Sequence, residues 1–315
     1  MDADGKIFQN PAIERAHESA LRSISRVVDE RATPTPPDVA LKNVVEQLRR
    51  GPALVLTGAG VSTDSGIPDY RGKSGRLTKG RPMTYQEFLY DAASRHRYWA
   101  RSFVGWRTMR VARPNRTHYA LVELERVGYL SGVITQNVDG LHEAAGTEQL
   151  LAIHGDMRHV VCLDCHHREP RSEFDARLEA ANCGFLDSIH ITDDMVNPDG
   201  DVDLPTSAVS AFNMPGCARC GSRRLKPDVV YFGENVPRKR REQADELLRE
   251  SASLLVVGSS LAVMSGYRLL LDARQQAKPV AVINGGPGRG DDKADTLWRT
   301  GVAEAFDLIL DELGL

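Results

Sequence analysis

The 315-residue sequence lacks several features that would each narrow its function at once. The longest apolar runs, such as Leu254 to Val257, are far too short to cross a bilayer. The chain also does not begin with a basic signal segment. It also lacks a large net charge, because 40 Lys and Arg residues and 43 Asp and Glu residues give a formal net charge of −3. We therefore expect a cytoplasmic protein with no membrane and no obligatory nucleic acid among its partners.

Cysteine is scarce, and because the five residues are odd in number and four of them are paired in motifs, a disulfide framework is the weaker explanation. Four of them form two Cys-x-x-Cys motifs, Cys162 with Cys165 and Cys217 with Cys220. Two motifs supply four thiolates, which close a tetrahedral shell, so we predict one structural zinc ion. A thioredoxin-like redox pair is the rival interpretation for either motif alone. The motifs lie 52 positions apart, against roughly 15–20 in typical zinc sites, which indicates an insertion.

The sequence also lacks the complete fingerprint of an ordinary dinucleotide-binding fold. The apolar run Ala53 to Leu56 predicts a buried parallel strand, and the glycine turn Gly58-Ala59-Gly60 follows it. Thr63 stands where the fingerprint has a third glycine, and no acidic residue ends a second strand about 20 positions on. Glycine still lets the backbone approach a pyrophosphate closely. The free N–H groups of a helix predicted from Val61 would point at the negative charge of that pyrophosphate, so we expect a nucleotide ligand.

Four further apolar runs predict strands of the same sheet, and each ends in small or polar residues. Carboxyl ends of parallel strands share one edge, so these residues indicate one site in a Rossmann-like α/β fold. His154 suits proton transfer near neutrality, although a lone histidine is more often structural and Asx residues often cap helices. The strand ends are Gln136-Asn137-Val138-Asp139 after Leu130 to Thr135, His154-Gly155 after Leu150 to Ile153, Gly258-Ser259-Ser260 after Ser253 to Val257, and Asn284-Gly285 after Val280 to Ile283.

The order of these elements predicts a domain organisation. Residues 1–38 form an extension, with a helical stripe over 11–31 and a Pro-rich linker. Residues 39–157 and 225–315 form the Rossmann-like domain, residues 73–113 an aromatic helical insertion with a core role, and residues 158–224 the zinc module. Leu225 to Glu234 reads as an edge strand of the main sheet, where an extended peptide could add as a further strand.

In unbroken order over about residues 40–310, these motifs resemble those of the sirtuins, the NAD-dependent protein deacylases. The segment Gly66-Ile67-Pro68-Asp69-Tyr70-Arg71 is one of these motifs. The segments Ser62-Thr63-Asp64-Ser65-Gly66 and Tyr98 to Trp106 are similar to the class II branch, which includes a mitochondrial lipoamidase and ADP-ribosyltransferase of animals. The resemblance implies a Rossmann-like domain with a small zinc module and a helical insertion. It also implies that NAD is consumed and that an acyl-lysine peptide of a protein substrate meets it between these parts, in a bacterial-type enzyme.

The resemblance assigns roles residue by residue. Gly58, Ala59 and Gly60 would hold the pyrophosphate, and Tyr70 and Arg71 would close over the nicotinamide ribose. Asn137 would orient the ribose or a water, Asp139 would bind the nicotinamide carboxamide, and His154 would act as general base on a ribose hydroxyl. Val230, Phe232 and Gly233 would line the acyl-lysine site. The remaining NAD contacts would be Asp64, Asp69, Gln136, Gly258, Ser259, Ser260, Asn284, Gly285 and Val302.

Two alternatives to lysine deacylation remain open from the sequence. A protein mono-ADP-ribosyltransferase would use the same site, and a non-catalytic NAD or ADP-ribose sensor would use the same fold. Two departures bear on specificity: Tyr70 stands where most deacetylases of the family have Phe, and Tyr98 and Arg101 match the Tyr-x-x-Arg spacing of the desuccinylase branch. We expect no acid-specific tunnel, and we expect a monomer.

Overall fold

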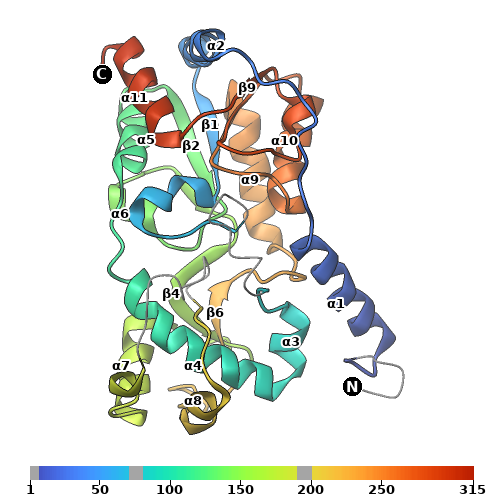
Figure 1. Ribbon diagram of the computed structural model, residues 1–315, viewed down its shortest axis with the longest axis vertical. Coiled ribbons are helices and arrows are strands. Elements are labelled where there is room, and N and C mark those ends of the chain that lie inside the picture. Colours follow the sequence, from blue (N-terminus) through green and yellow to red (C-terminus); the bar gives the residue numbers. More distant parts are fainter. Residues whose placement is uncertain (1–6, 71–80, 190–200) are drawn as a thin grey trace. The chain divides into compact units, whose positions relative to one another are not determined.

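The structure, a computed structural model, describes residues 7–70, 81–189 and 201–315 (Figure 1). Its contacts divide the chain into two compact units, each built from three segments. The sheet unit comprises Arg26–Gly75, Ala112–His154 and Val236–Leu315. The cysteine unit comprises Met1–Ser25, Arg76–Val111 and Gly155–Asn235. The domain boundaries that the sequence suggests, at residues 38, 157 and 225, stay predictions.

The sheet unit contains a parallel six-stranded sheet in the order β3-β2-β1-β7-β8-β9. This arrangement confirms the predicted Rossmann-like α/β class. All five predicted apolar runs form strands within one residue of their predicted bounds; β1 ends one residue later than predicted and β3 ends one residue earlier. The strands are β1 (Ala53–Thr57), β2 (Leu130–Thr135), β3 (Leu150–Ala152), β7 (Ser253–Val257), β8 (Val280–Ile283) and β9 (Thr296–Trp298).

Helices cover both faces of this sheet, which is why β1 and β7 are buried along their whole length (Figure 1). One core contains Val55 and lies under α2, α5 and α11; the other contains Leu54 and Leu56 and lies under α9 and α10. The short helices α6 and η6 complete the unit. The bounds are α2 (Pro37–Arg50), α5 (Arg116–Arg126), α6 (Leu141–Ala145), α9 (Arg238–Glu250), α10 (Met264–Gln275), η6 (Asp291–Lys293) and α11 (Val302–Leu313).

The helix predicted from Val61 is wrong. Two short 3₁₀ helices, η1 (Ala59–Val61) and η2 (Thr63–Ser65), follow the glycine turn instead. Gly66 ends η2 in a left-handed conformation with φ of 81°, and Pro68 follows two residues later. A proline at this point cannot supply the N–H that a longer helix would need, so the segment stays a compact loop.

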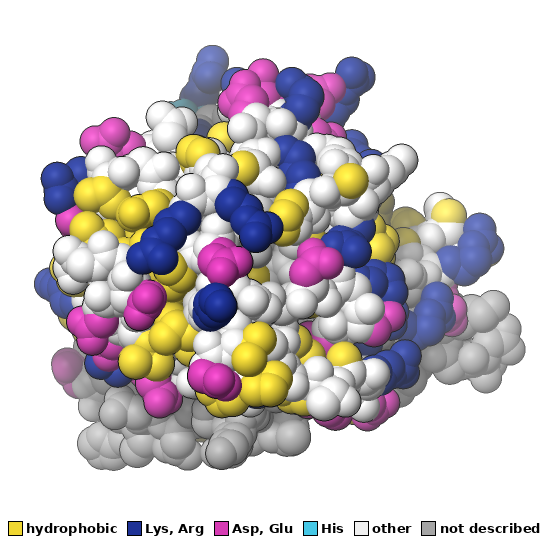
Figure 2. Space-filling model, turned by 90° about the horizontal axis from the view of Figure 1, so that it is seen from above, with side chains coloured by type: hydrophobic (Ala, Val, Ile, Leu, Met, Phe, Trp, Pro, Cys, Tyr) yellow, Lys and Arg dark blue, Asp and Glu magenta, His cyan; other side chains and the backbone are white. Residues whose placement is uncertain are grey.

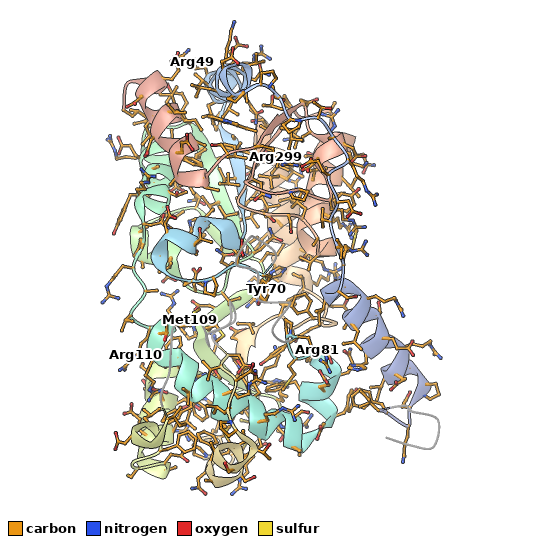
Figure 3. All side chains as sticks on the ribbon, viewed as in Figure 1. Arg49, Tyr70, Arg81, Met109, Arg110 and Arg299 are labelled. Atoms are coloured by element: carbon orange, nitrogen blue, oxygen red, sulfur yellow. The ribbon has the colours of Figure 1, made fainter. Side chains whose placement is uncertain are left out.

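The Pro-rich segment after the N-terminal helix is fixed to the edge of the sheet. Thr35 N–H donates to the Leu297 carbonyl at 2.8 Å, and the Leu297 N–H donates to Thr35 Oγ1 at 3.0 Å. Arg299, which is labelled in Figure 3, pairs with Glu30 at 2.8 Å and also with buried Asp291. The segment therefore shields the edge strand β9, whose free backbone groups could otherwise pair with another chain.

The cysteine unit contains a small antiparallel sheet in the order β5-β4-β6. The prediction that Leu225 to Glu234 joins the main sheet is therefore wrong, since β6 pairs with β4 in the register Cys162↔Leu225. An apolar run does not encode its partner, and here the turn of the second cysteine motif returns the chain beside the first. The bounds are β4 (Gly155–Cys162), β5 (Arg168–Pro170) and β6 (Leu225–Val229).

Helices with an aromatic core pack on this small sheet. Phe88, Trp99, Phe103 and Phe174 are fully buried, and the Trp99 Nε1–H donates to the Leu225 carbonyl at 2.8 Å. The predicted core role of the aromatic insertion is confirmed for its buried members, whereas Tyr90 is exposed. The helices are α1 (Pro11–Ile24), α3 (Tyr85–Tyr90), α4 (Ala92–Met109), α7 (Arg171–Ala181), η4 (Leu186–Ser188) and α8 (Thr206–Ala211).

The N-terminal helix is shorter than the predicted stripe. It ends at Ile24, the N–H of Ser25 closes its last turn on the Leu21 carbonyl, and Val27 beyond it is largely exposed. Among the described residues no helix is long and apolar enough to cross a membrane. On the face seen in Figure 2, Lys and Arg side chains are interspersed with Asp and Glu side chains.

Candidate active site

The glycine turn after β1 packs against the turn after β7. The Gly60 N–H donates to the Gly258 carbonyl at 2.9 Å, and a Cβ on Gly60 would lie 2.9 Å from the Gly258 Cα. A Cβ on Gly58 would lie 2.7 Å from the Ser259 Cβ. Close approach of two strand ends therefore requires glycine at both positions. Their role at the NAD pyrophosphate stays a prediction.

Asn137 and Asp139 are tied to this turn through Ser62, which is buried. The Ser62 hydroxyl donates to Asp139 Oδ2 at 2.8 Å, and the Asn137 amide Nδ2 donates to the Gly58 carbonyl and to Ser62 Oγ, both at 3.1 Å. Asp139 Oδ1 also accepts from the Leu141 N–H at the start of α6. Both amide hydrogens of Asn137 are used, and no hydrogen bond among the described residues reaches its Oδ1. That oxygen is the group with which Asn137 could orient a ribose hydroxyl or a water.

His154 lies at the same sheet edge, and its hydrogen bonds define its tautomer. Nδ1 lies 2.9 Å from the Gln136 carbonyl oxygen, which can only accept, so Nδ1 carries the proton. Nε2 is then the basic nitrogen, and it accepts from the Ser265 hydroxyl at 2.6 Å. A carbonyl that fixes the tautomer of a histidine is the arrangement expected of a general base.

Burial lowers the pKa of His154 below its ordinary value. The hydrogen bond to the Gln136 carbonyl acts in the opposite direction, and the positive charge of Arg240 lowers the pKa further. A lowered pKa keeps Nε2 unprotonated at neutral pH, which is the state in which it can accept a proton. The acid limb of any activity that uses this base should therefore lie below pH ~6.5.

Gln136 connects the ends of β1, β2 and β7. Its Nε2 donates to the Thr57 carbonyl at 3.2 Å and to Ser259 Oγ at 2.7 Å. Gly266, in the first turn of α10, packs so closely that a Cβ there would lie 2.5 Å from Gln136 Oε1. The five predicted strands run parallel, so their carboxyl ends lie at one edge of the sheet, as predicted. That these ends form one NAD site stays a prediction.

The other predicted NAD contacts are spread more widely. Asp64 is exposed in η2, Ser260 is half-buried beyond Ser259, and Val302 opens α11. The Asn284 amide Nδ2 donates to the Gly286 carbonyl at 2.7 Å. Gly285, between them, is exposed. Asp69 and Tyr70 are half-buried in the loop before residue 71, where Figure 3 labels Tyr70, and Arg71 lies outside the described residues.

Two neutral histidines lie beneath the glycine turn. His142 Nε2 is 2.9 Å from the Thr57 hydroxyl, and its ring centroid is 4.8 Å from that of His118. Burial lowers the pKa of His118 to about 4, and burial together with the nearby His118 lowers the pKa of His142 to about 3. Both rings therefore stay uncharged in the folded chain under conditions that protonate ordinary histidines.

This pair predicts acid-sensitive stability. Below pH ~6.5 both histidines take up protons in the unfolded chain, whereas in the folded chain His118 does so only near pH 4 and His142 only near pH 3. The free energy of unfolding therefore decreases as the pH is lowered through this range. We expect each histidine to lower the free energy of unfolding by about 1.5 kcal/mol between pH 6.5 and pH 5. Urea unfolding at a series of pH values measures the slope, and His118→Gln should make it shallower. Equal slopes for the two proteins would contradict this account.

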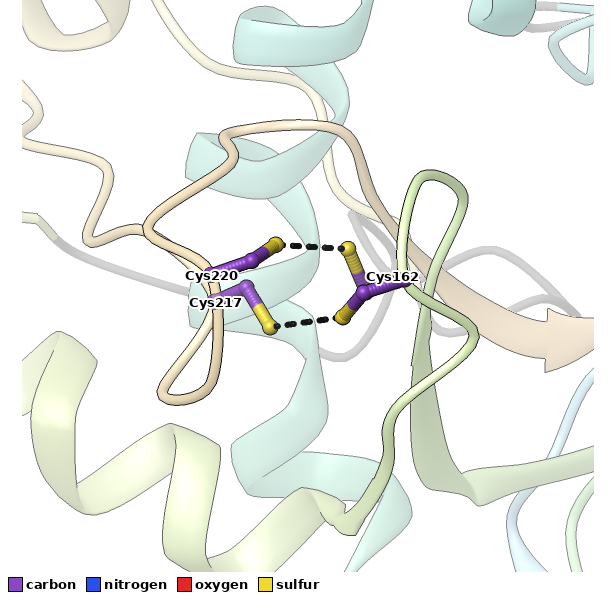
Figure 4. A group of neighbouring side chains, drawn as sticks. Cys162, Cys217 and Cys220 are labelled. Atoms are coloured by element: carbon purple, nitrogen blue, oxygen red, sulfur yellow. Dashed lines mark hydrogen bonds between the residues drawn. The ribbon is translucent and has the colours of Figure 1, made fainter.

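The four cysteines of the two motifs converge in the cysteine unit. Cys162 Sγ lies 3.6 Å from Cys220 Sγ, and Cys165 Sγ lies 3.7 Å from Cys217 Sγ, with all four within 4.8 Å of one another. Figure 4 shows Cys162 on one loop turned toward Cys217 and Cys220 on the other. A tetrahedral site with Zn–S bonds of ~2.3 Å needs sulfur atoms about 3.8 Å apart. The cluster therefore fits one structural zinc ion.

Both cysteine loops have the same turn. In the first loop the His166 N–H donates to the Cys162 carbonyl at 3.0 Å, and in the second the Gly221 N–H donates to the Cys217 carbonyl at 2.9 Å. Each donor lies four positions after the first cysteine of its motif. Both residues are left-handed, with φ of 57° and 74°. Burial would raise the pKa of Cys217, but hydrogen bonds from the N–H groups of Cys220 and Arg219 lower it to about 7. The N–H groups of the second loop therefore favour the thiolate form of Cys217.

Residues predicted to bind the acyl-lysine peptide follow β6. Val230 and Phe232 are half-buried, and Gly233 is left-handed with φ of 83°. The Phe232 carbonyl accepts from the Tyr85 N–H at 2.8 Å, and Thr84 and Phe232 form a parallel bridge. Their part in substrate binding stays a prediction.

The Tyr-x-x-Arg spacing does not present a free arginine. Arg101 pairs with Asp201 at 3.0 Å and with Asp203 at 2.5 Å, and its Nε–H donates to the Val202 carbonyl. Tyr98 is buried against the rings of Phe88 and Trp99. Because its charge is already neutralised by two carboxylates, Arg101 is poorly suited to bind an acidic acyl group. The expected absence of an acid-specific tunnel stays a prediction.

Sequence reasoning missed three residues of this site. Ser62 was visible beside the glycine turn, but nothing in the sequence marked it as the link between Asn137 and Asp139. Ser265 and Gly266 belong to α10, and no motif connects them to His154 or Gln136. Only the fold brings these side chains together.

Comparison with known proteins places this geometry in context. The sequence model of the Sir2 family matches residues 58–265. An NAD-dependent protein deacetylase of Corynebacterium efficiens is 62% identical over 88% of this chain and 98% of its own length. A mitochondrial NAD-dependent protein lipoamidase, sirtuin-4 of Bos taurus, is 44% identical over 81% of each chain.

Solved structures agree with the sequence comparison. One from a study of the mechanism and regulation of Sir2 enzymes has a TM-score of 0.68 and 30% identity, covering 88% of this chain and 98% of that chain. A structure of Sir2Tm bound to a propionylated peptide has a TM-score of 0.68 and 26% identity, covering 87% of this chain and 98% of that one.

Proposed function

The chain belongs to the Sir2 family, and from this premise we propose that it removes acyl groups from protein lysine side chains at the expense of NAD. In this reaction acyl-lysine, NAD and water give lysine, nicotinamide and the acyl ester of ADP-ribose. The observation that carries the proposal is the basic Nε2 of His154 at the same sheet edge as Asn137, Asp139 and the glycine turn.

Asn137, Asp139 and His154 have different roles in this reaction. Asn137, through its Oδ1, orients a ribose hydroxyl or a water, and Asp139 receives the nicotinamide carboxamide. The weakly nucleophilic oxygen of the substrate amide attacks the ribose carbon as nicotinamide leaves, which requires close positioning and the exclusion of water. His154 Nε2 then takes the proton of a ribose hydroxyl, and the oxygen of that hydroxyl attacks the former amide carbon. Water adds to the same carbon, its C–N bond breaks, and lysine leaves while the acyl group stays on the ribose of ADP-ribose.

The ion pairs of Arg101 in the cysteine unit support a proposal about acyl specificity. With Arg101 paired to Asp201 and Asp203, we infer a preference for neutral acyl groups, from acetyl to lipoyl, over succinyl and other acidic ones. Val230, Phe232 and Gly233 bind the acyl-lysine segment of the protein substrate. The zinc ion is structural, and the enzyme acts in the cytoplasm as a monomer.

The test is a panel of acyl-lysine peptides with NAD, followed by nicotinamide release and mass spectrometry of the products. Peptide-dependent release with an acyl-ADP-ribose product supports the proposal. An ADP-ribosylated protein product would indicate mono-ADP-ribosyl transfer instead, and absence of release would indicate a non-catalytic sensor. Faster turnover of succinyl-lysine than of acetyl-lysine would contradict the specificity.

A further inference from the structure

The N-terminal helix α1 (Pro11–Ile24) is not explained by the proposed reaction, yet it places a buried histidine in the cysteine unit. His17 is 1% exposed, and its Nδ1 lies 2.9 Å from Thr84 Oγ1. The ring of Phe8 covers it edge-on at 5.3 Å. Thr84 is the N-cap of α3 and lies 67 positions further along the chain, so this contact joins two distant segments.

The partners of Thr84 define the direction of this hydrogen bond. Its hydroxyl donates to Glu87 Oε2 at 3.2 Å and accepts from the Glu87 N–H at 3.3 Å in a capping box. A hydroxyl has one hydrogen, so His17 Nδ1–H is the donor to Thr84. Burial would raise the pKa of Glu87, but hydrogen bonds from Arg81, labelled in Figure 3, and from the Thr84 N–H lower it to about 2. The carboxylate therefore remains a permanent acceptor.

The same end of α3 holds the backbone that follows β6. Tyr85 N–H donates to the Phe232 carbonyl at 2.8 Å, and Gln86 Nε2 donates to the Gly233 carbonyl at 3.1 Å. Helix α1 also reaches this backbone directly, since a Cβ on Gly233 would lie 2.8 Å from the Ala20 Cβ. One turn of α1 thus contacts both the cap of α3 and Gly233.

We propose that His17 is a positioning residue for peptide binding, and that α1 acts through it and Ala20 to hold the segment Val230–Gly233 in place for an acyl-lysine peptide. This inference rests on the proposed function, in which that segment binds the substrate. An extended peptide loses affinity when the backbone that receives it is not held in advance. His17 touches neither substrate nor NAD site in this scheme, so its effect should fall on peptide binding.

The test compares His17→Ala with wild type in steady-state kinetics. We expect a roughly fivefold rise in KM for the acyl peptide, equivalent to one hydrogen bond of about 1 kcal/mol, with kcat and KM for NAD unchanged within about twofold. His17→Asn, whose amide can donate from the position of Nδ1, should restore KM. Ser19→Ala, an exposed change on the same helix, is the matched control and should behave as wild type.

Direct binding of a fluorescent acyl peptide gives a second readout that does not depend on turnover. If wild type shows no peptide-dependent nicotinamide release, the proposed function fails. If wild type is active and folded His17→Ala binds the peptide normally, the role of α1 fails. Should circular dichroism show that His17→Ala is unfolded, Gln86→Ala decides in its place, because it removes the link from α3 to Gly233; an unchanged peptide KM there overturns the inference.

Discussion

His154→Ala is expected to lower the deacylation rate at least ~10²-fold while leaving the affinity for NAD close to that of wild type. The reason is that Nε2 is the only ring nitrogen available as a base, because Nδ1 donates to the Gln136 carbonyl. Proton transfer at this nitrogen follows the binding of both substrates, so its loss affects turnover. Single-turnover deacylation of an acetyl-lysine peptide and calorimetric NAD titration measure the two quantities.

A second substitution separates base chemistry from ring packing. His154→Gln can keep hydrogen bonds to the Gln136 carbonyl and Ser265, but an amide takes up no proton near neutrality. It should be as slow as His154→Ala. The matched control is His166→Asn, which removes an exposed histidine at a left-handed position that asparagine tolerates. Near-normal turnover by His154→Gln would remove His154 from the role of general base.

How much of this site could be predicted depends on what the sequence encodes locally. The strands β1, β2, β7 and β8 are buried on both faces, so each appears as an apolar run ending at a glycine or a polar residue. Parallel pairing then places those ends on one edge, which is why His154, Asn137 and Gly58 were found together. The cysteine motifs were equally readable, since four thiolates at that spacing have few other uses.

The sequence did not encode which strand or side chain each segment contacts. The composition of Leu225 to Val229 suits a strand in either the main sheet or the small sheet, and only its pairing with β4, in the register Cys162↔Leu225, places it in the small sheet. The loop after Val61 shows the same limit, because Gly66 and Pro68 prevent the helix that the glycine turn predicts. Ser265 reaches His154 through the first turn of α10, a contact between positions 111 residues apart.

Removal of the metal is expected to unfold the cysteine unit. Cys162 and Cys217 are buried in the same core as Trp99 and Phe103, so opening the cluster exposes that core. Structural zinc sites contribute on the order of 10 kcal/mol to folding in zinc-finger peptides, which is comparable to the whole stability of a typical domain. Chelation, or Cys162→Ser, should therefore abolish deacylation together with folded structure in this unit.

The matched control is Cys183→Ser, because Cys183 is an exposed cysteine of the same unit that lies outside the cluster. It should keep one zinc per chain and wild-type melting. Trp99 and Trp106 report on the cysteine unit, whereas Trp298 lies in the core of the sheet unit, so Trp298→Phe leaves tryptophan fluorescence as a probe of the cysteine unit alone. A Cys162→Ser protein that retains one zinc and its native fluorescence would show that the four sulfur atoms do not hold a structural ion.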